Sequence, residues 1–301
     1  MSSKTVIIIT GPTASGKTEL GIELALHLDT SIISADSRQC YRELNIGVAK
    51  PSNHQLVQVK HHFINSHSVL EEVNASIFES LALQYCKEIF SSRNVVVMTG
   101  GTGLYIKAFR EGLDEIPFID ERIRKDILEH YQAYGINWLQ ESIRLTDPLF
   151  YESGEILNPQ RLMRALEVIK STNLSILTFR NQQKKQRPFQ ILEFGLEIPR
   201  KELYQRIDNR VDQMMDSGLM KEAKSLFAYR HLNALQTVGY KELFEYLKGN
   251  SSMENSISMI KQNTRHYAKR QITWLRKNEK ITWLGKDFLN TIMNNYRSVK
   301  T

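Results

Sequence analysis

The feature that most constrains this chain is a glycine-bounded loop near its start, between an apolar run and an amphipathic stretch. Residues 5–10 (TVIIIT) are rich in β-branched side chains, which is typical of a buried strand. The loop that follows, GPTASGKT at residues 11–18, matches the pattern GxxxxGK(S/T) in full. Residues 18–28 then carry apolar side chains at helical spacing. This order of strand, loop and helix predicts a phosphate-binding loop, or P-loop.

The residue types of this loop suit an anion. Its glycines let backbone N–H groups turn toward a phosphate, and the helix adds the partial positive charge of its N-terminus. Lys17 supplies a charge to the outer phosphates, and the Thr18 hydroxyl can hold Mg²⁺. We predict a phosphate site formed by Gly11, Pro12, Thr13, Ala14, Ser15, Gly16, Lys17 and Thr18. The loop identifies phosphates and not a base, so binding of a nucleotide such as ATP stays open.

Strands and helices alternate through the first third of the chain. Residues 31–35 and 94–99 predict strands, and residues 75–90 predict a helix between them. Such alternation is typical of a parallel sheet flanked by helices. Together with the loop, it predicts an α/β fold of the P-loop NTPase-like kind.

The texture changes after Gly112. Residues 113–187 are charged, helical in pattern and punctuated by proline, and residues 160–170 form a strong amphipathic pattern. Residues 189–198 then predict a strand that returns to the sheet, and the chain from Arg200 on reads as helical. We therefore predict a core of residues 1–112 and 188–301, interrupted by a helical insertion at 113–187.

Composition sets weaker limits. The net charge of +7 favours a polyanionic partner only slightly. The two cysteines, Cys40 and Cys86, form no closely spaced pair, which argues against a disulfide framework or a zinc site and for a reducing compartment. No apolar stretch approaches the roughly 20 residues of a membrane helix. These features predict a cytoplasmic protein that does not associate with membranes.

A second group of candidates follows the predicted strands at 31–35 and 94–99. Asp36 ends the strand 31–35, where open α/β sheets bind ligands, and it could act as a general base, cap a helix or hold a metal-bound water. Ser37, Arg38 and Gln39 come next; they suit contacts to base edges but also a solvated turn. Thr102, in TGGTGLY, could present its hydroxyl to a ligand or cap a helix.

The chemistry of these groups alone allows more than one enzyme. The strand 94–99 ends in Thr and Gly rather than in the Asp expected of an ATPase, yet Asp36 could face the acceptor of a small-molecule kinase. Residues 261–277 (KQNTRHYAKRQITWLRK) contain six basic residues and no acidic one. They predict a surface that contacts a phosphate backbone, or an amphipathic helix with a solvated basic side.

The whole pattern of motifs resembles one family, the tRNA dimethylallyltransferases (isopentenyl-tRNA transferases), over about residues 7–276. The motifs stand in that family's order and spacing: GPTASGKT, SADSRQCYREL, HHFI, GGTGLY, NPQRLMRALEV, TVGYKEL and TRHYAKRQITWLR. The chain has no cysteines near its C-terminus for the zinc finger of some eukaryotic relatives, so it resembles the bacterial type. It departs from the family pattern at Thr99, usually apolar, and at Asn65, often Asp.

The resemblance implies a prenyl transfer that consumes no ATP. The donor would be dimethylallyl diphosphate, and the acceptor N6 of the adenosine 3′ to the anticodon in tRNAs that read codons beginning with U. Diphosphate and N6-isopentenyladenosine would be the products, with Mg²⁺ as cofactor. The implied catalytic residues are Asp36, Lys17, Thr18, Thr102 and Arg210, with Arg206 as the alternative to Arg210.

The resemblance also implies a monomer that flips the target base out of the anticodon stem-loop, with the insertion clamping the anticodon arm. The residues it places against tRNA are Asp36, Ser37, Arg38, Gln39, Thr102, Arg124, Gln160, Arg161, Leu162, Met163, Arg164, Lys269, Arg270 and Arg276. Three alternatives stay open: prenyl transfer to a free adenine nucleotide, a P-loop small-molecule kinase, and an RNA-binding module without activity.

Overall fold

The chain divides into two units in a computed structural model that describes residues 4–180, 184–285 and 287–299. The first unit combines the residues up to Glu111 with those from Gln186 on, and the second is Gly112–Lys185. None of the helices in these described ranges is long and apolar enough to cross a membrane.

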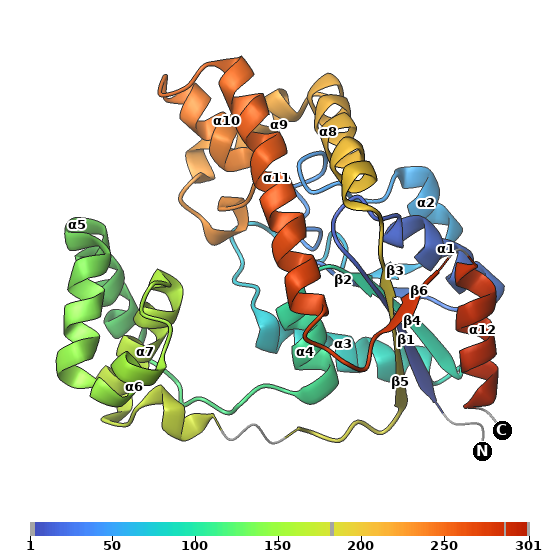
Figure 1. The fold of residues 1–301 in the computed structure, drawn as a ribbon, viewed down its shortest axis with the longest axis horizontal. Helices are drawn as coiled ribbons and strands as arrows, with labels where there is room; N and C mark the ends of the chain where they lie inside the picture. Colours follow the sequence, from blue (N-terminus) through green and yellow to red (C-terminus); the bar gives the residue numbers. More distant parts are fainter. Residues whose placement is uncertain (1–3, 181–183, 286, 300–301) are drawn as a thin grey trace. The chain divides into compact units, whose positions relative to one another are not determined.

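The first unit is built on a six-stranded sheet in which every pairing is parallel (Figure 1). The strand order is β3-β2-β4-β1-β5-β6. The strands are β1 (Thr5–Thr10), β2 (Ile32–Ala35), β3 (His61–His62), β4 (Val95–Gly100), β5 (Gln190–Leu196) and β6 (Thr282–Leu284). β1 and β4 lie at the centre and are buried on both faces, which explains their continuous apolar sequences.

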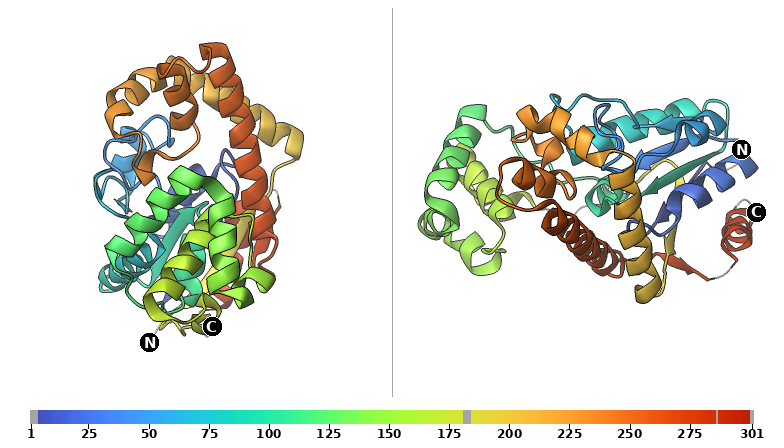
Figure 2. Two further views of the ribbon diagram at one scale, coloured as in Figure 1. Left: turned by 90° about the vertical axis from the view of Figure 1, so that its left-hand side faces the viewer. Right: turned by 90° about the horizontal axis from the view of Figure 1, so that it is seen from above.

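Helices cover both faces of this sheet (Figure 2). Side chains of β1 alternate between the faces, and Ile7 and Ile9 pack in one cluster with Leu24 of α1 and Ile292 of α12. On the other face α3 packs against α4, with the rings of Phe78 and Tyr105 stacked 4.5 Å apart. These helices are α1 (Lys17–His27), α3 (Ala75–Ile89), α4 (Gly103–Glu111) and α12 (Phe288–Ser298).

The remaining helices of the first unit lie in the connections from β2 to β3 and from β5 to β6. The long helix α11 packs against α8 and α10 (Figure 1). The α-helices are α2 (Asn53–Gln58), α8 (Arg200–Asp216), α9 (Leu219–Leu226), α10 (Tyr240–Leu247) and α11 (Met253–Leu275), and two 3₁₀ turns span Phe227–Tyr229 and Asn233–Leu235.

The second unit is helical and has its own core. Its elements are α5 (Glu121–Thr146), α6 (Pro148–Ser153), α7 (Pro159–Thr172) and a 3₁₀ turn at Ile176–Phe179. α5 and α7 pack along each other, and α5 is broken at Gly135, whose φ is 73°. Ile127, Leu139 and Phe150 are fully buried in this core.

The predicted fold class is confirmed, and so are the four predicted strands and the helices at 18–28, 75–90 and 160–170, with shifts of one or two residues. Two strands were not predicted. β3 and β6 have two and three residues at the sheet edges, too short for a period of two to stand out. β6 also corrects the expectation that the chain from Arg200 on is helical.

Candidate active site

Strand register brings three loops together at one edge of the sheet. Thr10 of β1 and Ala35 of β2 both lie level with Gly100 of β4. Because the strands are parallel, the loops that follow them leave the sheet side by side. The P-loop, the segment from Asp36 and the loop before α4 therefore share one edge.

The P-loop has the geometry of an anion site. Gly16, the residue before α1, has φ 88°, a left-handed conformation that glycine adopts without strain. Lys17 folds back over the loop, where its Nζ donates to the Pro12 carbonyl (2.6 Å) and lies 3.5 Å from Ser15 Oγ.

Two cations, Lys17 of the loop and Arg210 of α8, line the phosphate end of the site. Arg210 of α8 lies with its Nη1 3.5 Å from Thr13 Oγ1, whereas Arg206 is paired with Glu202 at 2.7 Å. Burial and the nearby charge of Arg210 lower the pKa of Lys17 to about 8, despite opposing contributions from Asp36 and Glu19. Burial also lowers the pKa of Arg210. A bound polyanion would relieve the repulsion between these cations.

Asp36 lines the same cavity as these cations. Its Oδ1 accepts hydrogen bonds from the backbone N–H groups of Arg38 (2.8 Å) and Gln39 (3.3 Å), which fixes the carboxylate at the end of β2. Thr102, just before α4, accepts from Ser37 N at 3.0 Å and lies 3.4 Å from Ser37 Oγ. Thr102 therefore connects the third loop to the segment that carries Asp36.

These groups line two adjoining cavities. The first, about 500 Å³, is bounded by the P-loop, Asp36 and Arg210. The second, about 410 Å³, shares Asp36 and Arg210 with the first and adds the apolar side chains Ile207, Val211 and Met214. The arrangement offers a cationic phosphate end, a carboxylate and an apolar wall within one space.

Arg38 and Gln39 are engaged within the protein. Arg38 Nη1 donates to the Asn233 carbonyl at 2.8 Å. The amide of Gln39 accepts from Ser34 Oγ (3.2 Å) and donates to the Ala49 carbonyl (3.1 Å). In this structure both side chains hold the walls of the cavities together.

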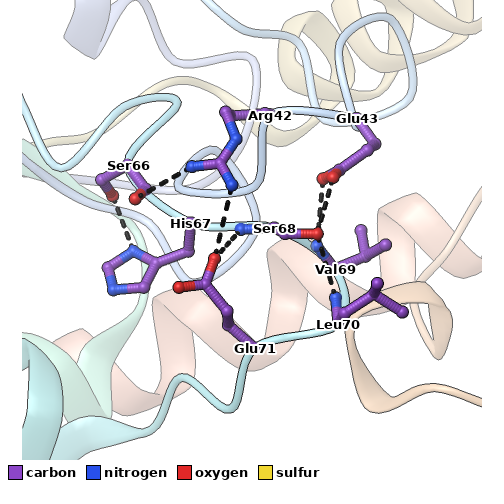
Figure 3. Close-up of polar contacts among 8 residues, drawn as sticks. All are labelled: Arg42, Glu43, Ser66, His67, Ser68, Val69, Leu70 and Glu71. Atoms are coloured by element: carbon purple, nitrogen blue, oxygen red, sulfur yellow. Dashed lines mark hydrogen bonds and ion pairs between the residues drawn. The ribbon is translucent and has the colours of Figure 1, made fainter.

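The segment after Asp36 is tied to the chain that follows β3. Figure 3 shows the Arg42 guanidinium donating to the Ser66 carbonyl, at 3.3 Å. It also shows the Glu43 carboxylate accepting from Ser68 Oγ (2.7 Å) and Val69 N (3.0 Å). Further along, Lys50 Nζ donates to Asn65 Oδ1 (2.5 Å). The asparagine therefore accepts a hydrogen bond from Lys50 at the position where the family often has Asp.

A single carboxylate fixes the loop between these ties. Glu222 of α9 accepts hydrogen bonds of 2.9–3.1 Å from the backbone N–H groups of Asn45, Ile46 and Gly47. It also accepts from the Tyr240 hydroxyl at 2.6 Å. The next residues of this loop line both cavities, so α9 helps to shape the site.

Helix α11 brings the basic stretch to the same edge. Lys269, Arg270 and Arg276 are exposed; Arg276 is paired with Glu197 at 2.6 Å, and Arg270 lies over the Tyr267 ring at 5.8 Å. Tyr267 lines both cavities and is 38% exposed. The helix therefore carries exposed basic side chains and also contributes Tyr267 to the walls of the cavities.

The remaining candidates belong to the second unit. Gln160 and Arg161 lie in the first turn of α7, and Arg161 pairs with Glu155 at 2.8 Å. Arg164 and Arg124 both approach Glu167, at 2.9 and 3.7 Å. Leu162 is fully buried and Met163 is 8% exposed, so their side chains pack in the core of this unit on the apolar face of the helix.

Three residues that line the cavities or hold their loops were not among the individually predicted site residues: Gln271, Tyr267 and Glu222. Gln271 and Tyr267 lie in the basic stretch 261–277, whose pattern of charges predicts a surface role and does not indicate which neutral side chains face the cavities. Glu222 gives no local signal of this role, because the backbone groups that it holds are 175–177 residues away in the chain.

The fold and the site define a class, the P-loop α/β proteins: a parallel sheet, a glycine loop between β1 and α1, and ligand groups at the carboxyl ends of the strands. Comparison narrows the class. The profile of the IPP transferase family matches residues 39–278. A tRNA dimethylallyltransferase of Christiangramia forsetii is 46% identical over 95% of this chain and 94% of its own. A Bacteroides fragilis tRNA dimethylallyltransferase 1 is 44% identical, covering 94% of both. The chain therefore belongs to the IPP transferase family.

Solved structures of two transferases are similar to this chain over nearly its whole length. The tRNA isopentenylpyrophosphate transferase of Bacillus halodurans superposes with a TM-score of 0.71 at 35% identity, covering 98% of this chain and 95% of the other. A eukaryotic dimethylallyltransferase acting on tRNA superposes with a TM-score of 0.80 at 25% identity, covering 99% and 81%.

Proposed function

We propose that this protein transfers the dimethylallyl group of dimethylallyl diphosphate to N6 of the adenosine 3′ to the anticodon, in tRNAs that read codons beginning with U. Membership of the IPP transferase family supports the substrates. The observation that carries the mechanism is a single cavity lined by the P-loop, Arg210 and Asp36.

The diphosphate is the leaving group. The bond between the allylic carbon and the diphosphate oxygen breaks, which places negative charge on diphosphate and positive charge on the prenyl group. The P-loop N–H groups, Lys17 and Arg210 stabilise the departing anion, and preorganised charge of this kind often contributes more to catalysis than any other effect. The apolar side chains of the second cavity suit the prenyl group.

The adenine amine is the nucleophile. A bond forms between N6 and the allylic carbon, and the proton that N6 loses goes to Asp36. An exocyclic amine is a weak base, so its orientation by Asp36 and Thr102 contributes as much as proton removal. The target base enters by flipping out of the anticodon loop.

The residues present fit a magnesium ion bound chiefly through the diphosphate. Thr18 offers a hydroxyl in the first turn of α1, at the wall of the first cavity. The described residues contain no cluster of three or more His, Cys, Asp or Glu side chains suited to a metal. Magnesium would add positive charge at the leaving diphosphate.

We propose that the protein binds its RNA as a monomer with both units. The exposed basic residues of α11, and Gln160, Arg161 and Arg164 of the second unit together with Arg124, would contact the phosphates and the anticodon arm. A free nucleotide as acceptor needs neither surface, which favours a whole tRNA.

A transfer assay tests the proposal. Purified protein and Mg²⁺ are mixed with labelled dimethylallyl diphosphate and either unmodified tRNA or AMP, and in parallel with ATP and no prenyl donor. Label in tRNA, at the adenosine 3′ to the anticodon, is the expected result. Label in AMP alone would mean a free-nucleotide prenyltransferase. ATP turnover without prenyl transfer would mean a kinase.

A further inference from the structure

We infer that the side-chain amide of Gln271 is a positioning residue that sets the separation between the leaving-group loop and the acceptor loop. The inference rests on the proposed function and deepens it. Gln271 lies on α11, 8% exposed, and belongs to neither the P-loop nor the segment that carries Asp36.

The amide uses both ends, one on each loop. Its Oε1 accepts a hydrogen bond from the backbone N–H of Thr13 in the P-loop, at 2.9 Å. Its Nε2 donates to the carbonyl of Gly101 in the loop before α4, also at 2.9 Å. One side chain therefore spans the P-loop and the loop that leads to Thr102.

Both loops continue directly into reacting groups. Thr13 Oγ1 lies 3.5 Å from Arg210, which faces the phosphate site. On the other side, Thr102 follows Gly101 and holds Ser37, the neighbour of Asp36, through a 3.0 Å hydrogen bond. A shift of either loop would change the distance between the diphosphate and the acceptor amine.

The fit around the amide is close. A Cβ on Gly101 would lie 2.4 Å from Gln271 Nε2, so glycine is needed there for the amide to approach. The two bonds also require opposite chemistry at two neighbouring atoms, an acceptor for the N–H and a donor for the carbonyl. Among side chains of this length, glutamine alone provides both at neutral pH.

Displacement of diphosphate from the allylic carbon requires the amine, that carbon and the leaving oxygen in line, and misplacement by about 1 Å can cost about 100-fold in rate. Gln271 acts on this alignment and not on the charges. Its loss should therefore reduce the rate of the bound complex while leaving the affinity for tRNA unchanged.

Three forms of the full-length protein test this: wild type, Gln271→Met and Gln271→Glu. Methionine keeps the length and removes both hydrogen bonds. We expect Gln271→Met to reduce the single-turnover rate at saturating substrates at least tenfold, with the Kd for tRNA within about twofold of wild type. In the Gln271→Glu variant, a protonated carboxyl can accept from Thr13 and donate to Gly101, whereas an ionised one can only accept. A glutamate with the ordinary pKa of about 4.3 is ionised near neutral pH, so Gln271→Glu keeps the hydrogen bond from Thr13 but loses the one to Gly101, and its rate should also fall at least tenfold.

A wild-type rate in Gln271→Met, a loss confined to tRNA affinity, or a wild-type rate in Gln271→Glu would overturn the inference. Should Gln271→Met fail to fold, Gln271→Glu carries the test. Amide hydrogen exchange of the peptide containing Thr13 gives a readout independent of activity, and it should accelerate in Gln271→Met. If wild-type protein transfers no prenyl group, the proposed function fails, and exchange still decides whether Gln271 holds the P-loop.

Discussion

At the scale of single residues, one cavity combines cations that suit a phosphate with a carboxylate that suits a proton. Lys17 and Arg210 carry charge at the phosphate end, and Asp36 lines the same cavity. Asp36 is held by two backbone N–H groups and Lys17 contacts the Pro12 carbonyl, whereas Arg210 reaches the loop from α8.

Asp36→Asn tests the proton acceptor. Asparagine keeps an oxygen for the N–H groups of Arg38 and Gln39, so the turn after β2 should persist. We expect transfer to fall by about 10²–10⁴, the usual range for a lost general base. Filter binding should show unchanged affinity for tRNA. Lost affinity with full turnover at saturation would mean that Asp36 binds the base without taking its proton.

Lys17 gives the site a pH dependence with a definite sign. Its pKa in the free protein is about 8, because it is buried beside Arg210. A diphosphate binds the protonated form better, so affinity for dimethylallyl diphosphate should be constant below about pH 8 and weaken above it. Calorimetry between about pH 7 and pH 9.5 measures this. Lys17→Arg, which stays charged, should bind with no such decline.

At the scale of elements, α9 acts on the site from a distance. Glu222→Ala would leave the N–H groups of Asn45, Ile46 and Gly47 without their acceptor. We expect a loss of about 3 kcal/mol in the free energy of unfolding, measured in urea. Glu202→Ala removes a half-exposed pairing with Arg206 and should leave the unfolding midpoint almost unchanged. Equal effects of the two changes would contradict the role given to Glu222.

Helix α11 carries the charge that should meet RNA. Arg270→Ala should weaken tRNA binding and make the slope of log affinity against log salt shallower by about 0.7–0.9. Lys261, on the same helix, is paired with Asp212 at 2.6 Å and serves as the control. The prediction fails if the slope is unchanged for Arg270→Ala or changes equally for Lys261→Ala.

At the scale of the whole molecule, the chain places the proposed RNA contacts in two units with separate cores. If both bind the same tRNA, Arg161→Ala should weaken tRNA binding without affecting dimethylallyl diphosphate. Its effect and that of Arg270→Ala should add in free energy. Glu155→Ala, which releases Arg161 from its 2.8 Å pairing, should not weaken binding. An unchanged affinity in Arg161→Ala would remove this surface from the proposed interface.

Local physics made much of the fold predictable. The β-branched runs of β1 and β4, the loop GPTASGKT and the amphipathic pattern of α7 are each specified by neighbours in the sequence. The short strands β3 and β6 were missed because their conformation comes from pairing with β2 and β5. The burial of Leu162 and Met163 follows from α7 packing on α5, which the motif by itself does not reveal.

The sequence by itself determined the phosphate loop, the carboxylate after β2 and the basic helix, because each is a local pattern of residue types. Only the tertiary structure decided what joins them. Gln271 meets Thr13 and Gly101 across 258 and 170 residues of chain, and Glu222 meets its loop across 175 or more. Such contacts depend on how strands align and helices cross, and a single polar residue in the sequence carries no sign of its distant partner.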